Sequence, residues 1–408
     1  MNDAARVLQL AEKYRDETAA NLGRLVRIRS GSGQEQDVNA ELARQLREAG
    51  FDEVRTDGLG NVIGRLGNGP RVLAIDAHMD TVGEGNRDNW SFDPFAGDVS
   101  GGFVRGRGSV DQEGGAAAFV TAGRILKELG LGDRLTLLVT GTVMEEDCDG
   151  LCWKYLVEQE GLRPELVIST EPTDLGVYRG QRGRMEMAVT FKGISAHGSA
   201  PERGDNAIYR AANACREIEQ LHGRLADDPF LGKGSITVTE IRSSSPSLCA
   251  VADFARLHVD RRLTRGETKE SAVVQLQEAV GPCGGRVEVL HYDGQAYTGL
   301  AYGMESYFPT WVLEEDHPAV RRGVDVHAAL FGAPPRVDKW TFSTNGVTIN
   351  GLYGIPVIGY GPGNEVLAHA PDEMVPVDDL VKASAFYALY ALAMAGEIAG
   401  ETTTGGEV

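Results

Sequence analysis

Histidines and acids follow several apolar runs of this sequence, at the point where each run ends. His78 and Asp80 close the run LAIDAHMD, and their spacing lets both side chains point to the same side of a strand. Asp111 lies in the Gly-rich stretch GRGSVDQEGG, where a carboxylate and the backbone can approach a bound ion closely. Glu145 and Glu146 follow the run LTLLVTGTVM, and because adjacent strand residues face opposite ways, one could bind a metal while the other transfers protons. Taken singly, these residues would also suit a surface loop, a helix N-cap or a solvated acidic turn.

Two further residues belong to the same pattern. Glu171 follows LVIST, and His369 lies in the loop after GIPVIGYGPG. The set therefore combines two histidines with several carboxylates from four or five separate elements, nearly all at strand ends. Such donors suit Zn, Mn or Co rather than metals that prefer thiolates. A carboxylate that bridges two divalent ions is the usual way to build a two-metal hydrolase, and Asp111 is the natural candidate.

Apolar runs that alternate between strand and helix patterns must position these residues. Helical spacing predicts two opening helices, over about 4–29 and 34–49, the second ended by Gly50. Short β-branched or Leu-rich runs then alternate with helical ones. This alternation predicts an α/β fold with a mixed, largely parallel sheet, whose strand ends are where ligands bind.

The pattern changes near Gly183. Residues 183–295 have the order β-α-β-β-α-β of a small ferredoxin-like α+β domain, which we interpret as an insertion. Residues 1–182 and 296–408 then form one discontinuous catalytic domain, which ends in a helix over 377–399. The polar, Gly- and Thr-rich tail 397–408 is predicted to be disordered.

Composition excludes several classes of function. The 408 residues include 59 acidic and 40 basic ones, a net charge of -19. This excess of acid disfavours nucleic acid and anionic membranes as partners. The sequence has neither a secretory signal nor an apolar run long enough for a membrane helix, so we expect a cytoplasmic protein. Five cysteines are too few and too scattered for a disulfide framework or a thiolate metal site.

His78-x-Asp80, Asp111, Glu145-Glu146, Glu171 and His369, in that order, resemble the motif set of the ArgE/DapE/aminoacylase/carboxypeptidase-G di-metal peptidases, in metallopeptidase clan MH. The segments VTGTVMEEDCDGLCW, EPTD, YRGQRGRME, HGSAPERGDNAI and DKWTFSTNG further resemble the YgeY-type branch of hydrolases linked to selenium metabolism. The resemblance covers essentially the whole chain. It implies a zinc-peptidase-like catalytic domain, an inserted ferredoxin-like lid through which two chains form a homodimer, and two divalent metal ions, Zn before Co or Mn.

The resemblance also implies which residues hold each metal. His78, Asp111 and Glu171 would hold one ion, and Asp111, Glu146 and His369 the other. Two cations lower the pKa of a bridging water toward neutrality, so a nearby carboxylate can take its proton.

Four more residues receive roles from the resemblance. Glu145 would be the general base on the metal-activated bridging water, and the Asp80 carboxylate would orient His78. His197 in the lid would reach the partner's active site and stabilise the oxyanion. Arg262 in HVDRRL would grip a substrate carboxylate; it alternates with Arg261 along a strand, so only one of the two can face the site.

Two segments depart from the family pattern. Cys249 in SPSLCAVADF stands where many relatives have an oxyanion-contacting Asn. The loop WTFSTNG replaces a Gly-rich acidic one, which makes ordinary peptides less suitable as substrates.

The leading hypothesis is metal-dependent hydrolysis of an amide-like C–N bond in a small N-acyl amino acid or dipeptide. An N-carbamoyl amino acid is the alternative substrate. A catalytically silent binding or assembly protein on the same scaffold is disfavoured, because Glu145 and the full ligand set are present. A thiol enzyme using Cys148 or Cys152 has no histidine close in sequence.

Overall fold

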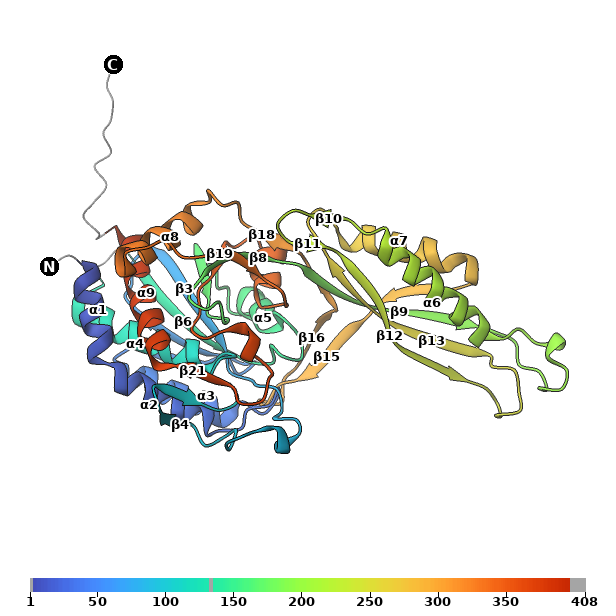
Figure 1. The fold of residues 1–408 in the computed structure, drawn as a ribbon, viewed down its shortest axis with the longest axis horizontal. Helices are drawn as coiled ribbons and strands as arrows, with labels where there is room; N and C mark the ends of the chain where they lie inside the picture. The colour runs from blue at the N-terminus through green and yellow to red at the C-terminus, as the bar shows by residue number, and fades with distance from the viewer. Residues whose placement is uncertain (1–2, 132–134, 397–408) are drawn as a thin grey trace, which may run out of the picture.

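The computed structural model describes residues 3–131 and 135–396. Within them, two sheets and two clusters of apolar side chains account for most of the chain. Figure 1 shows that the smaller sheet extends away from the larger one. The tail 397–408, for which we predicted disorder, lies outside the described residues, as does the end of the helix predicted over 377–399.

The larger sheet has nine strands in the described residues and carries the strand ends of interest. Its order is β1-β2-β6-β3-β7-β20-β8-β18, with β19 also paired to β8. Neighbours β6, β3, β7 and β20 are parallel, whereas β1, β2 and β18 join antiparallel. The bounds are β1 (Glu53–Thr56), β2 (Val62–Leu66), β3 (Arg71–His78), β6 (Leu135–Thr142), β7 (Leu166–Ser169), β8 (Val177–Gln181), β18 (Trp311–Val312), β19 (Val337–Trp340) and β20 (Val357–Gly359). The expected α/β class with a mixed sheet is confirmed.

Helices surround this sheet. They are α1 (Asp3–Lys13), α2 (Arg15–Val26), α3 (Gln36–Ala49), α4 (Glu113–Leu129), α5 (Leu151–Glu158), α8 (Pro318–Phe331) and α9 (Val377–Ala395). Helices α4 and α9 pack on β3 and β6, and almost every residue of α9 is buried. As predicted, α3 ends at Gly50, which has φ 86°. The single helix predicted over 4–29 is instead two, because the chain breaks at the buried Tyr14 without a Pro or Gly to signal it.

The smaller sheet is built from residues that follow Gly183. Its order is β12-β13-β9-β14, all antiparallel, with helices α6 and α7 on one face. The bounds are β9 (Gly183–Lys192), α6 (Ala207–Gly223), β12 (Ser235–Ser244), β13 (Phe254–Leu263), α7 (Lys269–Val280) and β14 (Arg286–Val289). This order of elements is β-α-β-β-α-β, apart from the small ribbon β10 (Asp227–Asp228) and β11 (Gly232–Lys233).

The chain returns to the larger sheet through a ribbon, β15 (His291–Gln295) and β16 (Ala301–Glu305), whose Ala296 and Met304 pack into the larger core. The last strand of the predicted β-α-β-β-α-β order, expected over 286–292, is therefore two strands, β14 and β15, that separate at Leu290. Strand β17 (Tyr307–Phe308) then pairs with β9. The predicted boundary at 295/296 falls inside the ribbon, and the division into two domains stays a prediction, consistent with two separate cores.

Short elements complete the fold. Strands β4 (Asp98–Ser100), β5 (Phe103–Arg105) and β21 (Met374–Pro376) form a small sheet. One-turn helices are η1 (Arg87–Asn89), η2 (Pro201–Arg203), η3 (Gly281–Cys283) and η5 (Glu365–Leu367), and η4 (Val347–Leu352) is a π-helix. Among the described residues, no helix has the length and apolar content needed to cross a bilayer.

Candidate metal centre

The acids and histidines singled out in the sequence meet at one edge of the larger sheet. His78 ends β3, Glu145 and Glu146 follow β6, and Glu171 follows β7. These strands are parallel neighbours, so their carboxyl ends lie together. His369 comes from the loop after β20, which is parallel to β7.

Asp111 reaches this edge from the loop before α4. The start of that helix lies against the end of β7, and a Cβ on Gly115 would lie only 2.0 Å from Thr170 Oγ1. Glycine at this position therefore lets the loop approach the strand end that carries Glu171.

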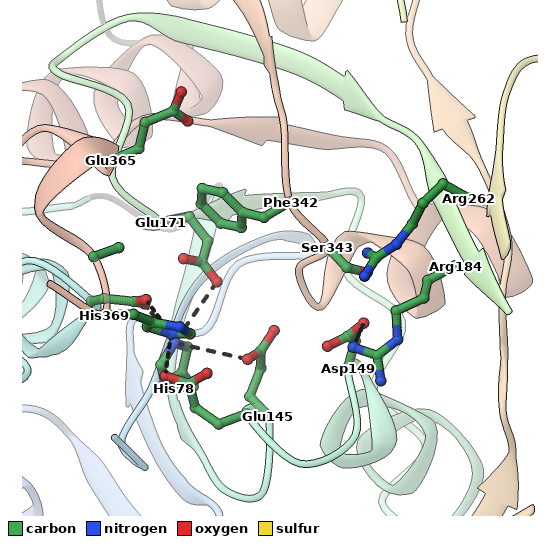
Figure 2. Close-up of a pocket in the computed structure, with 13 residues that line it drawn as sticks. His78, Glu145, Asp149, Glu171, Arg184, Arg262, Phe342, Ser343, Glu365 and His369 are labelled. Carbon is green, nitrogen blue, oxygen red and sulfur yellow. Dashed lines mark hydrogen bonds and ion pairs between the residues drawn. The ribbon is translucent and has the colours of Figure 1, made fainter. Parts of the chain in front are cut away.

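Asp111 lies between the two imidazoles. Its Oδ1 is 2.9 Å from His78 Nε2, and its Oδ2 is 3.2 Å from His369 Nε2. His369 Nε2 is also 3.0 Å from Glu146 Oε1. Figure 2 shows the Glu145 and Glu171 carboxylates directed toward His78, each 3.9 Å from its Nε2. A bridging position for Asp111 fits this geometry.

The crowded carboxylates shift the pKa values of the whole group. Hydrogen bonds with Asp111 and Glu146 raise the pKa of His369 to about 10. Burial alone would lower the pKa of His78, but its hydrogen bond to Asp111 and the charges of Glu145 and Glu171 raise it well above its usual value. Burial raises the pKa of both Glu145 and Glu171. The edge is thus a site where positive charge is strongly favoured.

The donor set fits divalent cations. Two groups of side chains bring their ligand atoms within 4.8 Å of one another: His78 with Glu145 and Glu171, and His78 with Asp111 and Glu146. Glu145 Oε1 and Glu171 Oε2 are buried and have no hydrogen-bond partner among the described residues. Oxygen and imidazole donors with lone pairs left free are what Zn, Mn or Co require.

A pocket of about 290 Å³ opens from this cluster. Its far wall carries Arg262 on β13 and Arg184 on β9, which are directly opposite each other across the two strands and therefore on one face. Arg261 points the other way and is buried against Glu267 and Gln275. Of the two arginines considered in the sequence, Arg262 is thus the one on the pocket wall.

Comparison with known proteins identifies the family of this chain. The sequence model of peptidase family M20/M25/M40 matches residues 74–393. The chain belongs to peptidase family M20/M25/M40. The predicted family is therefore confirmed, and with it a metal-binding hydrolase that acts on C–N bonds.

Similar sequences and solved structures are consistent with membership of this family. The chain is 53% identical to an uncharacterized protein, YgeY, of Escherichia coli (strain K12), over 94% of this chain and 95% of that one. It is 28% identical to the succinyl-diaminopimelate desuccinylase of Methylocella silvestris, over 85% and 90% of the two chains. The Bacillus subtilis YXEP protein, described as a dinuclear metal-binding peptidase of family M20, superposes with a TM-score of 0.69 at 14% identity, covering 94% and 99%.

In this M20 chain, the Asp80 carboxylate does not hydrogen-bond to the His78 imidazole, as the family resemblance implied, but to other groups. His78 Nδ1 lies 2.7 Å from the backbone carbonyl of Asp80, whereas the nearer carboxylate oxygen is 3.7 Å away. The carboxylate instead accepts the backbone N–H groups of Glu145 (3.1 Å) and Glu146 (3.0 Å) and the Ser32 hydroxyl (2.6 Å). Asp80 therefore orients His78 through its carbonyl and fixes the two glutamates through its side chain.

Sequence reasoning missed a buried pair that supports the M20 metal centre. Glu373 accepts the backbone N–H groups of Val110 (2.8 Å) and Asp111 (3.1 Å), and it forms an ion pair with the buried Arg107. Because Glu373 shares its loop with His369, it joins the backbones that carry two of the expected ligands. Arg107 and Glu373 lie in the polar stretches GRGSV and HAPDE, which gave no local signal that these two side chains would be buried and paired.

Arg184 was missed as well. It forms ion pairs with Asp149 (3.3 Å) and Glu186 (2.9 Å), and its side chain is only 19% exposed. The period-two alternation of RMEM in β9 was a signal, because it puts Arg184 and Glu186 on the face opposite the buried methionines.

His197 and Cys249 lie away from this pocket. They belong to the two loops beyond the outer ends of β9 and β12, where Gly198 N donates to Cys249 O at 2.7 Å. His197 contacts Ser199, and both His197 and Cys249 are exposed. The structure therefore does not bring His197 to the metal centre of its own chain.

The loop WTFSTNG forms part of the pocket. Phe342 and Ser343 line it, while Thr344 and Asn345 are buried. Asn345 donates to the buried Asp76 (2.9 Å) and accepts from Gly150 N (2.9 Å), so it ties this loop to the segment that follows Glu146.

The thiol-enzyme interpretation is not supported. Cys148 and Cys152 are buried, and burial raises the pKa of both thiols. A reactive cysteine needs the opposite shift and access to solvent.

Proposed function

We propose that this chain hydrolyses the amide-like C–N bond of a small N-acyl amino acid or dipeptide, with two divalent cations and with Glu145 as general base. The observation that carries the proposal is one pocket with the complete ligand set at one end and Arg262 at the other. The scissile bond would lie at the cations and the carboxylate of the leaving amino acid at Arg262.

The proposed ligands are those named from the sequence: His78, Asp111 and Glu171 for one cation, Asp111, Glu146 and His369 for the other, with Asp111 shared. Zn is the expected metal, with Co or Mn as substitutes. When bound, the cations would polarise the substrate carbonyl and lower the pKa of the attacking water.

Glu145 is the proposed proton carrier. Burial raises its pKa, which suits a carboxylate that must take a proton from water and then give it up again. Asp80 supports this role, because its bond to the Glu145 N–H fixes the backbone from which the carboxylate extends. Glu145 would deliver the proton to the leaving nitrogen.

Arg262 is proposed to hold the leaving half. Its Nε and Nη2 donate to the two carboxylate oxygens of Asp260 at 2.9 and 3.3 Å, which leaves the Nη1 side of the planar guanidinium for a substrate carboxylate. Arg184, directly across the strand pair, adds a second positive charge to the same wall.

The homodimer and the role of His197 belong to this proposal. Strand β12 is an edge of its sheet, with Ile241 exposed on it, and Ile208 and Tyr209 are exposed on α6. Such a surface supports pairing of two chains through the inserted domain. His197 at the outer end would then act in the partner's pocket as the oxyanion donor.

Glu145→Gln tests the chemistry. We expect turnover to fall by about 100- to 10,000-fold, while metal analysis still finds about two ions per chain and the unfolding midpoint is retained. Glu315→Gln, at an exposed acid, is the matched control and should behave as the unaltered chain. Normal turnover of Glu145→Gln, or full activity of metal-free protein, would contradict the proposal.

Mixing two inactive variants tests the dimer. If His197 acts across an interface, mixed His197→Ala and Glu145→Ala chains recover part of the activity, since one pocket in a mixed dimer has both groups. Absence of recovery, with subunit exchange verified, would show that His197 acts within one chain or not at all.

A further inference from the structure

The chain bends where it leaves β6, and Met144 lies at the bend. The backbone φ of Met144 is 60°, a left-handed conformation that residues other than glycine seldom adopt. Its side chain is buried and belongs to the larger core. Glu145, the proposed general base, is the next residue. The direction in which Glu145 leaves the backbone therefore depends on a conformation that surrounding contacts must hold.

Four successive N–H groups follow β6, and each donates to a side-chain oxygen from a distant part of the chain. The four pairs are Val143 with Asn61 (3.1 Å), Met144 with Glu35 (3.0 Å), Glu145 with Asp80 (3.1 Å) and Glu146 with Asp80 (3.0 Å). Turns that contain a left-handed residue let neighbouring N–H groups converge on anionic oxygens. The bend after β6 is therefore held mainly by two acids of the protein itself.

Glu35 binds the N–H group of the left-handed residue. It immediately precedes α3, and its side chain is buried. The oxygen that accepts the Met144 N–H, Oε1, also accepts the Gly33 N–H at 2.9 Å, which fixes the carboxylate from its own loop. Ser32 in this loop donates to Asp80 at 2.6 Å. One loop thus supports both acids that bind the bend.

The charge of Glu35 is unfavourable in this environment. Burial, and then the charge of Asp80, raise the pKa of Glu35 to about 7, while the hydrogen bonds from Gly33 and Met144 lower it. A neutral side chain of the same length would avoid both penalties and still offer an oxygen. The contribution of Glu35 to the bend is therefore its hydrogen-bond acceptor and not its charge.

We propose that Glu35 is a positioning residue for hydrolysis: its bond to the Met144 N–H holds the left-handed bend from which Glu145 and Glu146 extend into the metal centre. This inference rests on the proposed function, because it concerns the general base and one of the metal ligands named there. Glu35 does not line the pocket, so it acts through the backbone. Without the bond, Met144 can return to an ordinary backbone conformation, and both glutamates are displaced with it.

Three substitutions of Glu35 separate the acceptor from the charge. Glu35→Gln keeps an oxygen that can accept both N–H groups but has no charge. Glu35→Asp keeps the charge, but it is one methylene shorter, which withdraws the carboxylate from Met144 N. Glu35→Ala has neither. We expect kcat to fall about 10- to 100-fold in Glu35→Ala and to stay within about 3-fold in Glu35→Gln, with Glu35→Asp between them. KM should stay within about 3-fold, because Arg262 is untouched.

Thr136→Val is the matched control. Thr136 is buried at the opposite end of β6, where its hydroxyl donates to Gly69 O at 2.7 Å. The variant loses a buried hydrogen bond of the same strand, so it should lower the unfolding midpoint but leave kcat unchanged. Each assay runs at saturating zinc and well below the midpoint of the variant.

Two results would overturn the positioning role. One is normal kcat in folded Glu35→Ala. The other is a kcat for Glu35→Gln that does not exceed that of Glu35→Asp, since catalysis would then not follow the acceptor. This second comparison decides the matter if Glu35→Ala does not fold.

Zinc binding separates this inference from the proposed function. If the unaltered chain hydrolyses no N-acyl amino acid or dipeptide, the proposed function fails, but Glu146 still extends from the same bend. Calorimetry of the metal-free chain with zinc then replaces the activity assay. Glu35→Ala and Glu35→Asp should weaken zinc binding, by about 10- to 100-fold for Glu35→Ala, whereas Glu35→Gln should not. Equal affinities in the three variants would refute the role of Glu35.

Discussion

Replacing Asp80 by alanine tests how Glu145 and Glu146, the proposed general base and metal ligand, are held. The Asp80 side chain is fully buried and accepts the N–H groups of Glu145 and Glu146. Hydrogen bonds to a charged acceptor contribute about 1.5–3 kcal/mol each, so the two backbone bonds together contribute about 3–6 kcal/mol. Part of this loss is offset, because Asp80 and Glu35 repel each other. Burial and then the Asp80 charge raise the pKa of Glu35 to about 7. We therefore expect Asp80→Ala to lower the free energy of unfolding by about 2–4 kcal/mol.

Catalysis should fall as well, for a geometric reason. Once its N–H loses the anchor, Glu145 can move relative to the attacking water, and a shift of about 1 Å costs about 100-fold in rate. The assay is kcat at saturating zinc together with the urea midpoint of the zinc-loaded chain. Asp88→Asn, at an exposed position, is the control.

Two results would refute this reasoning. Normal kcat and midpoint in Asp80→Ala would show that the backbone bonds do not position Glu145. Weakened zinc affinity with normal kcat at saturating zinc would show that the carboxylate acts on His78, as the family resemblance implied, and not on the glutamates.

Three further predictions concern other buried or paired groups. Glu373→Gln leaves the guanidinium of Arg107 buried without its counter-charge, so we expect about 3–5 kcal/mol of destabilisation and weaker zinc binding by calorimetry; an unchanged midpoint and affinity would contradict it. Because burial raises the pKa of the Cys148 and Cys152 thiols, a disulfide reagent should leave both unmodified in the folded chain and Cys148→Ala should stay active, and an inactive but folded variant would revive a thiol mechanism. Burial alone would raise the pKa of Glu41, but hydrogen bonds from Arg44, Gln45 and Arg24 lower it to about 2. A depressed folded-state pKa gives stability that is present above the unfolded value near 4.5 and lost as pH falls toward 2. Glu41→Gln should therefore cost about 1 kcal/mol at pH 7, discounted for partly exposed partners, and nothing near pH 2; a loss independent of pH would exclude this cause.

The meeting of these acids and histidines at one edge of the sheet could be predicted from sequence, because most of them are tied to a local pattern. A buried strand is a run of apolar residues, and the residue after it lies at the edge of the sheet. His78 ends one such strand, Glu146 and Glu171 follow two others, and parallel pairing then brings the three residues together without any long-range information. The break at Tyr14 has no such pattern, since it depends on packing against the rest of the core.

The supporting residues escaped prediction because each acts on a partner far away in the chain. Glu373 holds the backbone at Asp111, which lies far earlier in the chain. Arg184 on β9 of the smaller sheet pairs with Asp149, which lies just before α5. These residues stabilise the site through the groups that they contact, and those contacts cannot be predicted from the local sequence. The same reason explains Asp80: its position two residues after His78 made the imidazole the obvious partner, whereas the folded chain offers it two backbone N–H groups at the end of β6. The meeting of the proposed ligands at one edge thus follows from strand order, while the precision of the site depends on buried acids whose partners only the fold supplies.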